Sequence, residues 1–123
     1  MKNQKNTLTG KEVLQAAREK ISTPDRWAQG HFSRGKSGRP VILGSKAACS
    51  WCALGAVLTT DSPQSSKQEA EFAMTKACIR LHSCSVPTFN DGVCTLHEDV
   101  LALFDEAIKE CDLPAPCASP EPS

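Results

Sequence analysis

The chain has 123 residues, 40% of them hydrophobic and 23% charged, which is the composition of one soluble globular domain and not of a disordered chain. Its cysteines number seven, and this odd count argues against a disulfide framework, while the polar first residues do not resemble a secretory signal. We therefore expect a cytoplasmic protein with reduced thiols, no cofactor and no membrane attachment.

The net charge of zero conceals two oppositely charged halves. Residues 1–46 contain ten Lys/Arg and three Asp/Glu, a net charge of +7, whereas residues 47–123 contain four and eleven, a net charge of −7. Such asymmetry indicates either a binding surface for nucleic acid or an acidic partner, or two halves that fold against each other so that much of the field cancels. We favour cancellation, because the basic residues are spread out along the first half.

The first predicted helix begins at Thr9, because Thr9 and Glu12 have the spacing of a capping box and an amphipathic pattern follows them. Residues 29–43 then lose the helical period: they contain three glycines and Pro40, and end in the apolar run Val41-Ile42-Leu43. This pattern predicts a small β-hairpin or an irregular loop. The basic part of this segment, residues 31–39, is called the flap below.

The most apolar stretch of the chain is residues 47–58, which carries no charge and a single conventional polar side chain, Ser50. A segment that is apolar nearly all round predicts a core helix covered by its neighbours on every side. Two further capping-box spacings, at residues 66–69 and 95–98, predict the starts of the last two helices.

These elements predict a mainly α fold of four helices, with an apolar central helix and a small β-hairpin between the first two. Residues 9–112 form a single helical domain in this interpretation. A flexible arm, residues 1–8, precedes it, and a proline-rich tail, residues 113–123, follows it and is disordered by composition.

Three motifs carry a resemblance to a known family: Trp-Cys-Ala-Leu-Gly-Ala at residues 51–56, Phe-Asn-Asp at residues 89–91, and the leucine-rich segment at residues 100–105. The chain resembles, over roughly residues 10–110, a family of small bacterial and phage proteins of unknown function. One departure is Ala28, where the family often has a cysteine after the first tryptophan. The resemblance implies an α-helical fold and assigns no activity.

Cys52 is the strongest candidate for catalysis. If Ser50 capped the central helix, the Cys52 thiol would lie in the first turn, where backbone amides lower a thiol pKa. His82 or, in our preferred set, His97 would then act as base, and Asn90 or preferably Asp91 would orient it. If the helix begins at Ser45 instead, Cys52 is a buried packing residue, and the continuous apolar run favours this second interpretation.

Cys52 also belongs to a candidate zinc site. Cys49, Cys52, His82 and Cys84 are residue types that bind zinc, but the second pair lacks a standard spacing, so we expect no metal. The turn at residues 90–92 is most simply structural, since Asx side chains and glycine favour turns.

The remaining candidates form two groups that could bind a partner. The flap combines cations with an aromatic ring, which is most simply a solvated basic loop, but this composition also suits contact with an acidic partner or with nucleic acid. The second group is the loop after the predicted third helix, because recognition residues often lie in loops between helices. The candidate binding residues are His31, Phe32, Arg34, Lys36, Arg39, Phe89, Asn90 and Asp91.

The leading hypothesis is a non-catalytic protein-interaction module, in one version a phage or bacterial modulator or inhibitor of a host defence system. The alternatives are a small hydrolase or transferase that depends on Cys52, and a nucleic-acid-binding protein that uses the flap. No helix-turn-helix or RNA-binding signature accompanies the flap, which makes nucleic acid the weaker alternative.

Overall fold

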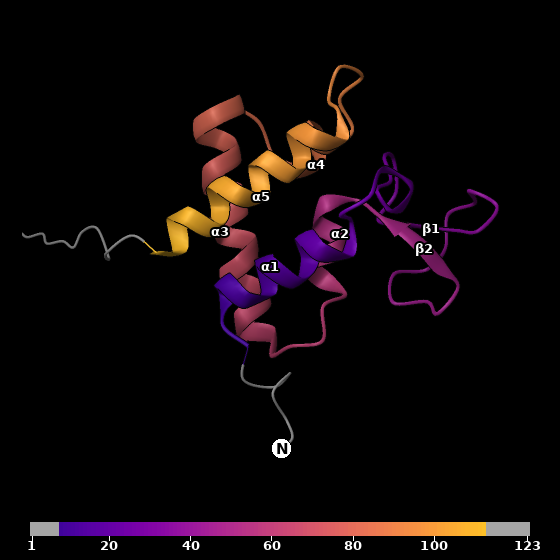
Figure 1. Ribbon diagram of the computed structural model, residues 1–123, viewed down its shortest axis with the longest axis horizontal. Helices are drawn as coiled ribbons and strands as arrows, with labels where there is room; N and C mark the ends of the chain where they lie inside the picture. Colours follow the sequence, from indigo (N-terminus) through magenta and orange to yellow (C-terminus); the bar gives the residue numbers. More distant parts are fainter. Residues whose placement is uncertain (1–7, 113–123) are drawn as a thin grey trace, which may run out of the picture.

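The computed structural model describes residues 8–112, and these form a mainly helical domain with one small antiparallel sheet (Figure 1). In chain order the elements are α1 (Gly10–Lys20), the 3₁₀ helix η2 (Pro24–Arg26), β1 (Ser33–Gly35), β2 (Ala48–Trp51), α2 (Ala53–Leu58), α3 (Gln64–His82), α4 (Val86–Asn90) and α5 (His97–Asp112). The predicted tail, residues 113–123, and all of the predicted arm except Leu8 lie outside the described residues.

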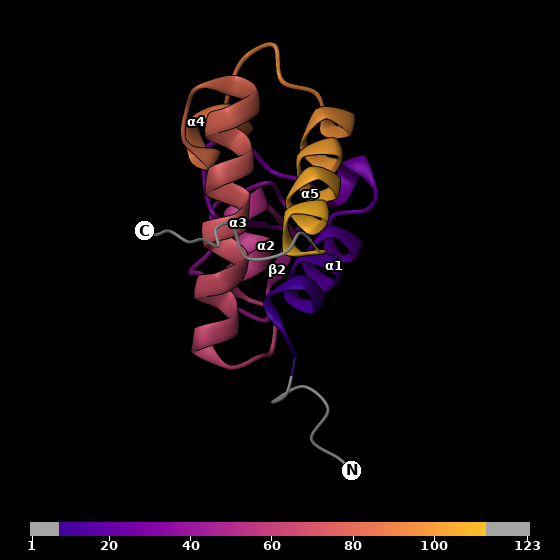
Figure 2. The same cartoon turned by 90° about the vertical axis from the view of Figure 1, so that its left-hand side faces the viewer.

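Three long helices, α1, α3 and α5, pack against one another and enclose the hydrophobic core. Figure 2 shows α3 and α5 side by side, with α1 against them. The largest fully buried side chains come from all three helices and include Leu14, Met74 and Phe104. Burial of a side chain of this size contributes roughly 1.5–3 kcal/mol. The short helix α2 packs between α1, α3 and α4, so it connects the core to the sheet.

Only the first of the three predicted capping boxes forms. The Thr9 hydroxyl accepts a hydrogen bond from the Glu12 amide at 3.2 Å, and the Glu12 carboxylate accepts from the Thr9 amide at 2.9 Å. The second prediction is wrong because α3 begins earlier, and the Ser66 hydroxyl instead donates to the carbonyl of Leu8. The third is also wrong, since α5 begins at His97.

The predicted central helix is wrong in its first half. Residues 48–51 form strand β2, Cys52 caps the next element, and only residues 53–58 are helical. A continuous apolar run is compatible with a buried strand as well as with a helix, and its pattern alone does not distinguish them. Pairing with β1 satisfies the backbone of residues 48–51 and makes this segment a strand.

The sheet therefore does not lie within residues 29–43, where the hairpin was predicted. β1 pairs with β2 in an antiparallel register that sets Ser33 opposite Trp51 and Arg34 opposite Ser50. Within the predicted hairpin there remains one isolated bridge, between Arg34 and Pro40. Pro40 has no amide hydrogen to donate to a longer ladder, which limits this pairing.

A fifth helix, α4, occupies a segment that was predicted as a loop. The Ser85 hydroxyl accepts from the Thr88 amide at 3.3 Å and caps the helix, and proline stands in its first turn. Both features favour helix initiation. The described residues thus contain five α-helices, not the four predicted.

None of the helices in residues 8–112 combines the length and the hydrophobicity needed to cross a lipid bilayer.

Candidate binding site

Asn90, at the end of α4, holds three segments of the chain together. Its side chain is 1% exposed, and its Oδ1 accepts from the Trp27 indole N–H at 2.8 Å and from the Ala53 amide at 3.0 Å. Its Nδ2 donates to the carbonyl of Ala28 and to the carboxylate of Asp91, both at 3.0 Å. The Asn90 side chain thus accepts two hydrogen bonds and donates two, which is the full number that a buried amide normally makes. Asn90 is therefore a structural residue and is not available to a ligand.

Cys52 ends β2 and caps α2. Its amide donates to the carbonyl of Phe32 at 3.1 Å, and its Sγ accepts from the amide of Gly55 at 3.2 Å. A side chain at Gly55 would collide with the same Phe32 carbonyl, so only glycine lets the flap approach α2 this closely. Two residues of the Trp-Cys-Ala-Leu-Gly-Ala motif therefore fix the position of the flap.

The Cys52 thiol is 6% exposed. Burial is the main cause that raises the pKa of this thiol, and the nearby Asp91 carboxylate raises it further, while the backbone amides of Gly55 and Leu54 act in the opposite direction. The first of the two sequence interpretations placed Cys52 in the first turn, with a lowered pKa. Cys52 does lie at the start of a helix, but its burial raises the thiol pKa by more than the backbone amides lower it.

A cleft of about 250 Å³ opens between the start of the flap and the end of α4. The Gly30 amide donates to the Asp91 carboxylate at 2.8 Å and fastens its two sides together. The residues that line it are Gly30, His31, Phe32, Cys52, Pro87 and Asp91. The structure thus brings together three of the predicted binding residues, His31, Phe32 and Asp91, and adds Cys52.

The two histidines proposed as catalytic bases do not line this cleft. His97 Nε2 lies 2.7 Å from the carbonyl oxygen of Ile21, and its ring lies against that of Trp27. The ring of His82 stacks on Phe89, with 3.9 Å between the ring centroids and an angle of 14° between the planes. Phe89, a predicted binding residue, is therefore partly covered by a neighbouring helix end and lies away from the cleft lining.

Of the three other predicted flap residues, Arg34 is held by hydrogen bonds within the flap, whereas Lys36 and Arg39 are exposed. The Arg34 guanidinium donates to the carbonyl of Gln29 through two nitrogens, at 2.7 and 3.2 Å, and to the carbonyl of Gly38 at 2.8 Å. It closes the base of the flap. Lys36 and Arg39 are exposed and form no ion pair within the described residues.

Ion pairs between α1 and α5 offset only part of the charge asymmetry between the two halves of the chain. Arg18 pairs with Asp105 at 2.8 Å, and Lys11 pairs with Asp112 at the same distance. Residues 25–46 contain five Lys/Arg and one Asp, a net charge of +4. The predicted cancellation is therefore only partial, and the uncancelled positive charge lies on the flap side.

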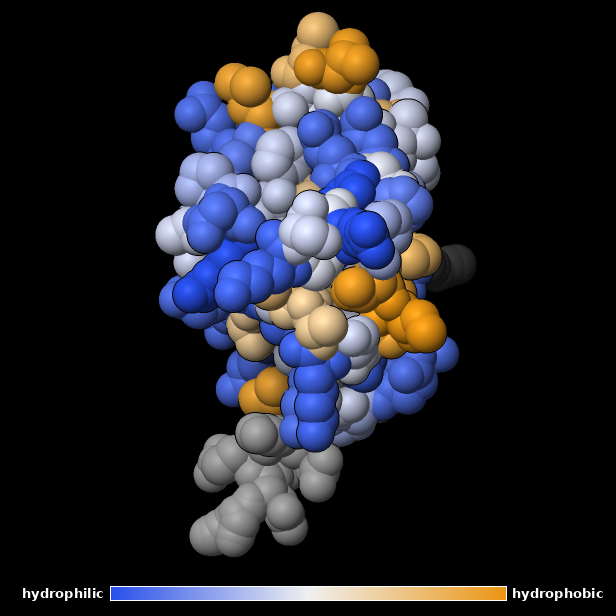
Figure 3. Space-filling view, turned by 90° about the vertical axis from the view of Figure 1, so that its right-hand side faces the viewer, coloured by the Kyte–Doolittle hydropathy of each residue, from blue (hydrophilic) through white to orange (hydrophobic). Residues whose placement is uncertain are grey.

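Sequence reasoning missed the apolar component of this surface. Ile42 is 84% exposed and Leu43 is 37% exposed, and Phe32 is 47% exposed at the mouth of the cleft. Ile42 and Leu43 lie between the free cations Arg39 and Lys46 along the chain. Figure 3, which views the side of the β1–β2 ribbon, shows apolar groups beside strongly hydrophilic ones on this face. The signal in the sequence was present in Val41-Ile42-Leu43, but these residues were interpreted as part of a small β-hairpin or an irregular loop and not as a binding surface.

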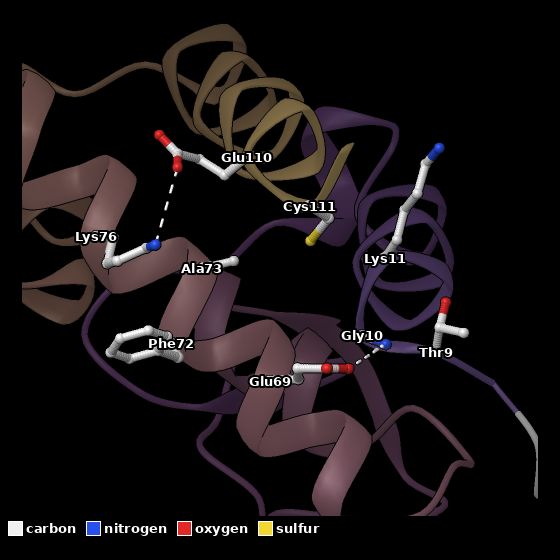
Figure 4. Close-up of a pocket in the computed structure, with 9 residues that line it drawn as sticks. All are labelled: Thr9, Gly10, Lys11, Glu69, Phe72, Ala73, Lys76, Glu110 and Cys111. Atoms are coloured by element: carbon white, nitrogen blue, oxygen red, sulfur yellow. Dashed lines mark hydrogen bonds and ion pairs between the residues drawn. The ribbon is translucent and has the colours of Figure 1, made fainter. Parts of the chain in front are cut away.

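A second hollow, of about 380 Å³, lies between the start of α1 and the facing sides of α3 and α5 (Figure 4). Its polar groups satisfy one another: the Gly10 amide donates to the Glu69 carboxylate at 3.0 Å, and Lys76 pairs with Glu110 at 4.0 Å. Because its charged groups already bond to one another, it is a weaker candidate for a site.

Within residues 8–112, no three His, Cys, Asp or Glu side chains come close enough together to hold a metal ion. Cys49, one of the four candidate zinc ligands, is exposed, so residues 47–58 are not covered on every side as the predicted core helix would be.

No curated protein and no solved structure matches this sequence. A family model does match, over residues 5–110, and this range includes every described element up to the last turns of α5. The chain belongs to this family, DUF6197, a family of unknown function.

Proposed function

We propose that this protein is a non-catalytic protein-interaction module, and that it binds an acidic partner segment containing aliphatic side chains. The observation that carries the proposal is the combination of free cations and exposed apolar groups within one segment, residues 32–46. Lys36, Arg39 and Lys46 have no ion-pair partner among the described residues, and Ile42 and Phe32 in the same segment expose 84% and 47% of their surface. We call this set of five residues the flap surface.

The flap surface suits a protein better than a nucleic acid. Phosphate groups would be attracted by the cations, but the aliphatic chain of Ile42 has no partner on a nucleic-acid backbone. Residues 47–112 contain ten Asp/Glu and four Lys/Arg, a net charge of −6, which repels a polyanion that extends beyond the flap. Asp91 places one of these carboxylates directly at the cleft.

The cleft next to the flap surface gives the partner a place to anchor one side chain. Interfaces gain most of their energy from a few groups that enter well-packed pockets, with charged groups at the rim. The exposed ring of Phe32 and the side chain of Pro87 form apolar walls, and a volume of about 250 Å³ suits a single anchoring side chain. His31 and Asp91 supply polar groups at the edge of the cleft.

A Cys52-dependent hydrolase or transferase is the second candidate, because the cleft brings Cys52 next to His31 and Asp91. A nucleophilic cysteine needs a thiolate at working pH and access for its substrate. The Cys52 thiol is 6% exposed and its pKa is raised by burial, and both properties oppose that role. We therefore assign Cys52 to the floor of the binding cleft.

The module is proposed to act in the cytoplasm of a bacterial cell, where its thiols stay reduced. One version of this proposal is a modulator or inhibitor of a host system, for which an acidic surface on the host protein would be the target. The flap surface provides the complementary charge for such a target, and charge complementarity speeds association and selects partners.

The proposal is tested by photo-crosslinking in a bacterial extract, one half treated with nuclease and the other half left untreated, with a benzophenone amino acid at position 42. A matched variant carries the same group at Ala102, an exposed position on α5. We expect a discrete protein adduct at position 42 and none at position 102, and we expect the crosslinked segment to be acidic. Equal crosslinking at both positions, or none at 42, would contradict the proposal, and an adduct that nuclease removes would favour nucleic acid instead.

A further inference from the structure

Two cysteines outside the cleft, Cys78 and Cys84, lie close together at the end of α3, where Cys84 packs against the buried cluster that contains Cys78. Cys78 is fully buried on the inner face of α3, in the last turns of that helix. Cys84 comes just after the helix and is half-buried against the same core. Burial raises the Cys78 pKa most, and the Cys84 thiol lies near enough to Cys78 to be the main neighbouring group that raises it further. No other element separates them, so the contact follows from how α3 ends.

The end of α3 explains the contact through its capping geometry. Ser83 adopts the left-handed conformation, with φ of 59° and ψ of 30°, and its amide donates to the carbonyl of Ile79 at 2.9 Å. This is the common αL termination of a helix, which turns the chain back over the last turn. In this motif the residue after the left-handed one packs against a residue in the last helical turns, and here those two residues are Cys84 and Cys78.

We propose that Cys78 and Cys84 form a reversible intramolecular disulfide when the protein meets a low-molecular-weight disulfide such as oxidised glutathione. Partly exposed Cys84 reacts first: its thiolate attacks the small disulfide, forms a mixed disulfide and releases one small thiolate. The Cys78 sulfur then attacks the Cys84 sulfur and displaces the second small thiolate. The two protons lost from the protein thiols end on the two small thiols, so protein dithiol plus small disulfide gives protein disulfide plus two small thiols.

The other described cysteines are worse placed for this reaction. Cys49, Cys94 and Cys111 are exposed and lie in β2, in the loop between α4 and α5, and in α5, so we expect them to form adducts with the small disulfide and not to pair with one another. Burial, and next the neighbouring Cys84, raise the pKa of Cys78 to about 12, so the second step is slow at neutral pH and gains speed in mild base. The closed disulfide ties the end of α3 to the segment that begins α4.

The test uses the full-length native protein, oxidised glutathione, alkylation of the remaining thiols, and tryptic peptide mapping without reductant. Trypsin cuts after Arg80, between the two cysteines, so residues 77–80 leave as a free peptide unless a disulfide joins them to residues 81–109. We expect the joined peptides, lighter by two hydrogen atoms than the sum of the separate ones. Fragmentation of the joined peptides then places the bond at Cys84 and not at Cys94, and reductant releases them.

Two variants make the test specific, because Cys94 lies on the same tryptic peptide as Cys84. The joined peptides are expected to be lost in Cys84→Ser and kept in Cys94→Ser. Recovery of residues 77–80 as a free peptide from oxidised wild-type protein, or a fragmentation pattern that places the bond at Cys94, would overturn the proposal. The wild-type result decides even if a variant folds poorly.

Discussion

Replacement of Asn90 by alanine tests the structural role of this residue. The substitution leaves the amide of Ala53 without its acceptor, and Ala53 is fully buried, so water cannot replace the lost bond. The indole N–H of Trp27 and the carbonyl of Ala28 also lose their partner. A buried polar group without a partner costs about 1–3 kcal/mol, and partial access of water to Trp27 reduces its share, so we expect a loss of about 3 kcal/mol.

The assay is equilibrium unfolding in urea, followed by tryptophan fluorescence. Domains of this size are usually stable by about 5–15 kcal/mol, so the expected loss moves the transition midpoint far outside experimental error. Asn90→Asp preserves the shape of the side chain but points an oxygen at the Ala28 carbonyl and at the Asp91 carboxylate, so we expect it to be destabilised too. The exposed control Gln68→Ala should change stability by less than about 0.5 kcal/mol. A loss below about 1 kcal/mol in Asn90→Ala would refute the reasoning.

Three further outcomes are expected. Iodoacetamide applied to native protein near pH 7 should label exposed Cys49 well before Cys52, as read by peptide mapping, and equal labelling rates would revive the enzyme hypothesis. The pKa of the Cys78 thiol is raised from 9.0 to about 12 in the folded protein, so the unfolded chain loses this proton first as the pH rises from 9 to 12. In this window the free energy of unfolding of wild type should therefore fall by about 1.4 kcal/mol per pH unit more than that of Cys78→Ala. Parallel plots of unfolding free energy against pH for the two proteins would argue against the raised pKa. Gly55→Ala should cost roughly 2–3 kcal/mol in a urea titration, because its methyl group meets the Phe32 carbonyl, and an unchanged midpoint would mean that the flap does not lie so close to α2.

The long amphipathic helices were predictable because their period and caps are local properties of the sequence. The capping box at Thr9 marks the start of α1 correctly, and the last predicted helix is present as α5, although it begins at His97, later than the capping-box spacing indicates. A mainly α fold with a small sheet follows from these patterns. The start of α3 was missed because Ser66 bonds to Leu8, a residue far away in sequence, and local spacing does not reveal such a partner.

The segment around Cys52 could not be predicted from its own residues. Its apolar run satisfies a helix and a buried strand equally well, and the strand forms because β1, more than a dozen residues earlier in the chain, offers backbone partners. The role of Gly55 depends likewise on a carbonyl of the flap that packs against it. Both features arise from contacts between distant segments, which a periodicity analysis does not contain.

The candidate site was predicted in part. His31, Phe32 and Asp91 were selected from the sequence and line one cleft, whereas Asn90 is buried in a hydrogen-bond network and Arg34 is used to close the flap. An asparagine in a loop has the same sequence signal whether it faces a ligand or bonds to backbone groups of other segments. Only the arrangement of those segments distinguishes a binding residue from a structural one.

The central claim is that free cations on the flap surface recognise an acidic partner, and it is tested most directly by calorimetric titration. The ligand is a synthetic peptide of the segment crosslinked at position 42, and the proteins are wild type and the triple variant Lys36→Glu, Arg39→Glu, Lys46→Glu. Each exposed pair contributes about 0.5–1 kcal/mol, so the account predicts at least about tenfold weaker binding by the variant and a clear loss of wild-type affinity at high salt. An affinity unchanged by both the charge reversal and the salt would contradict it.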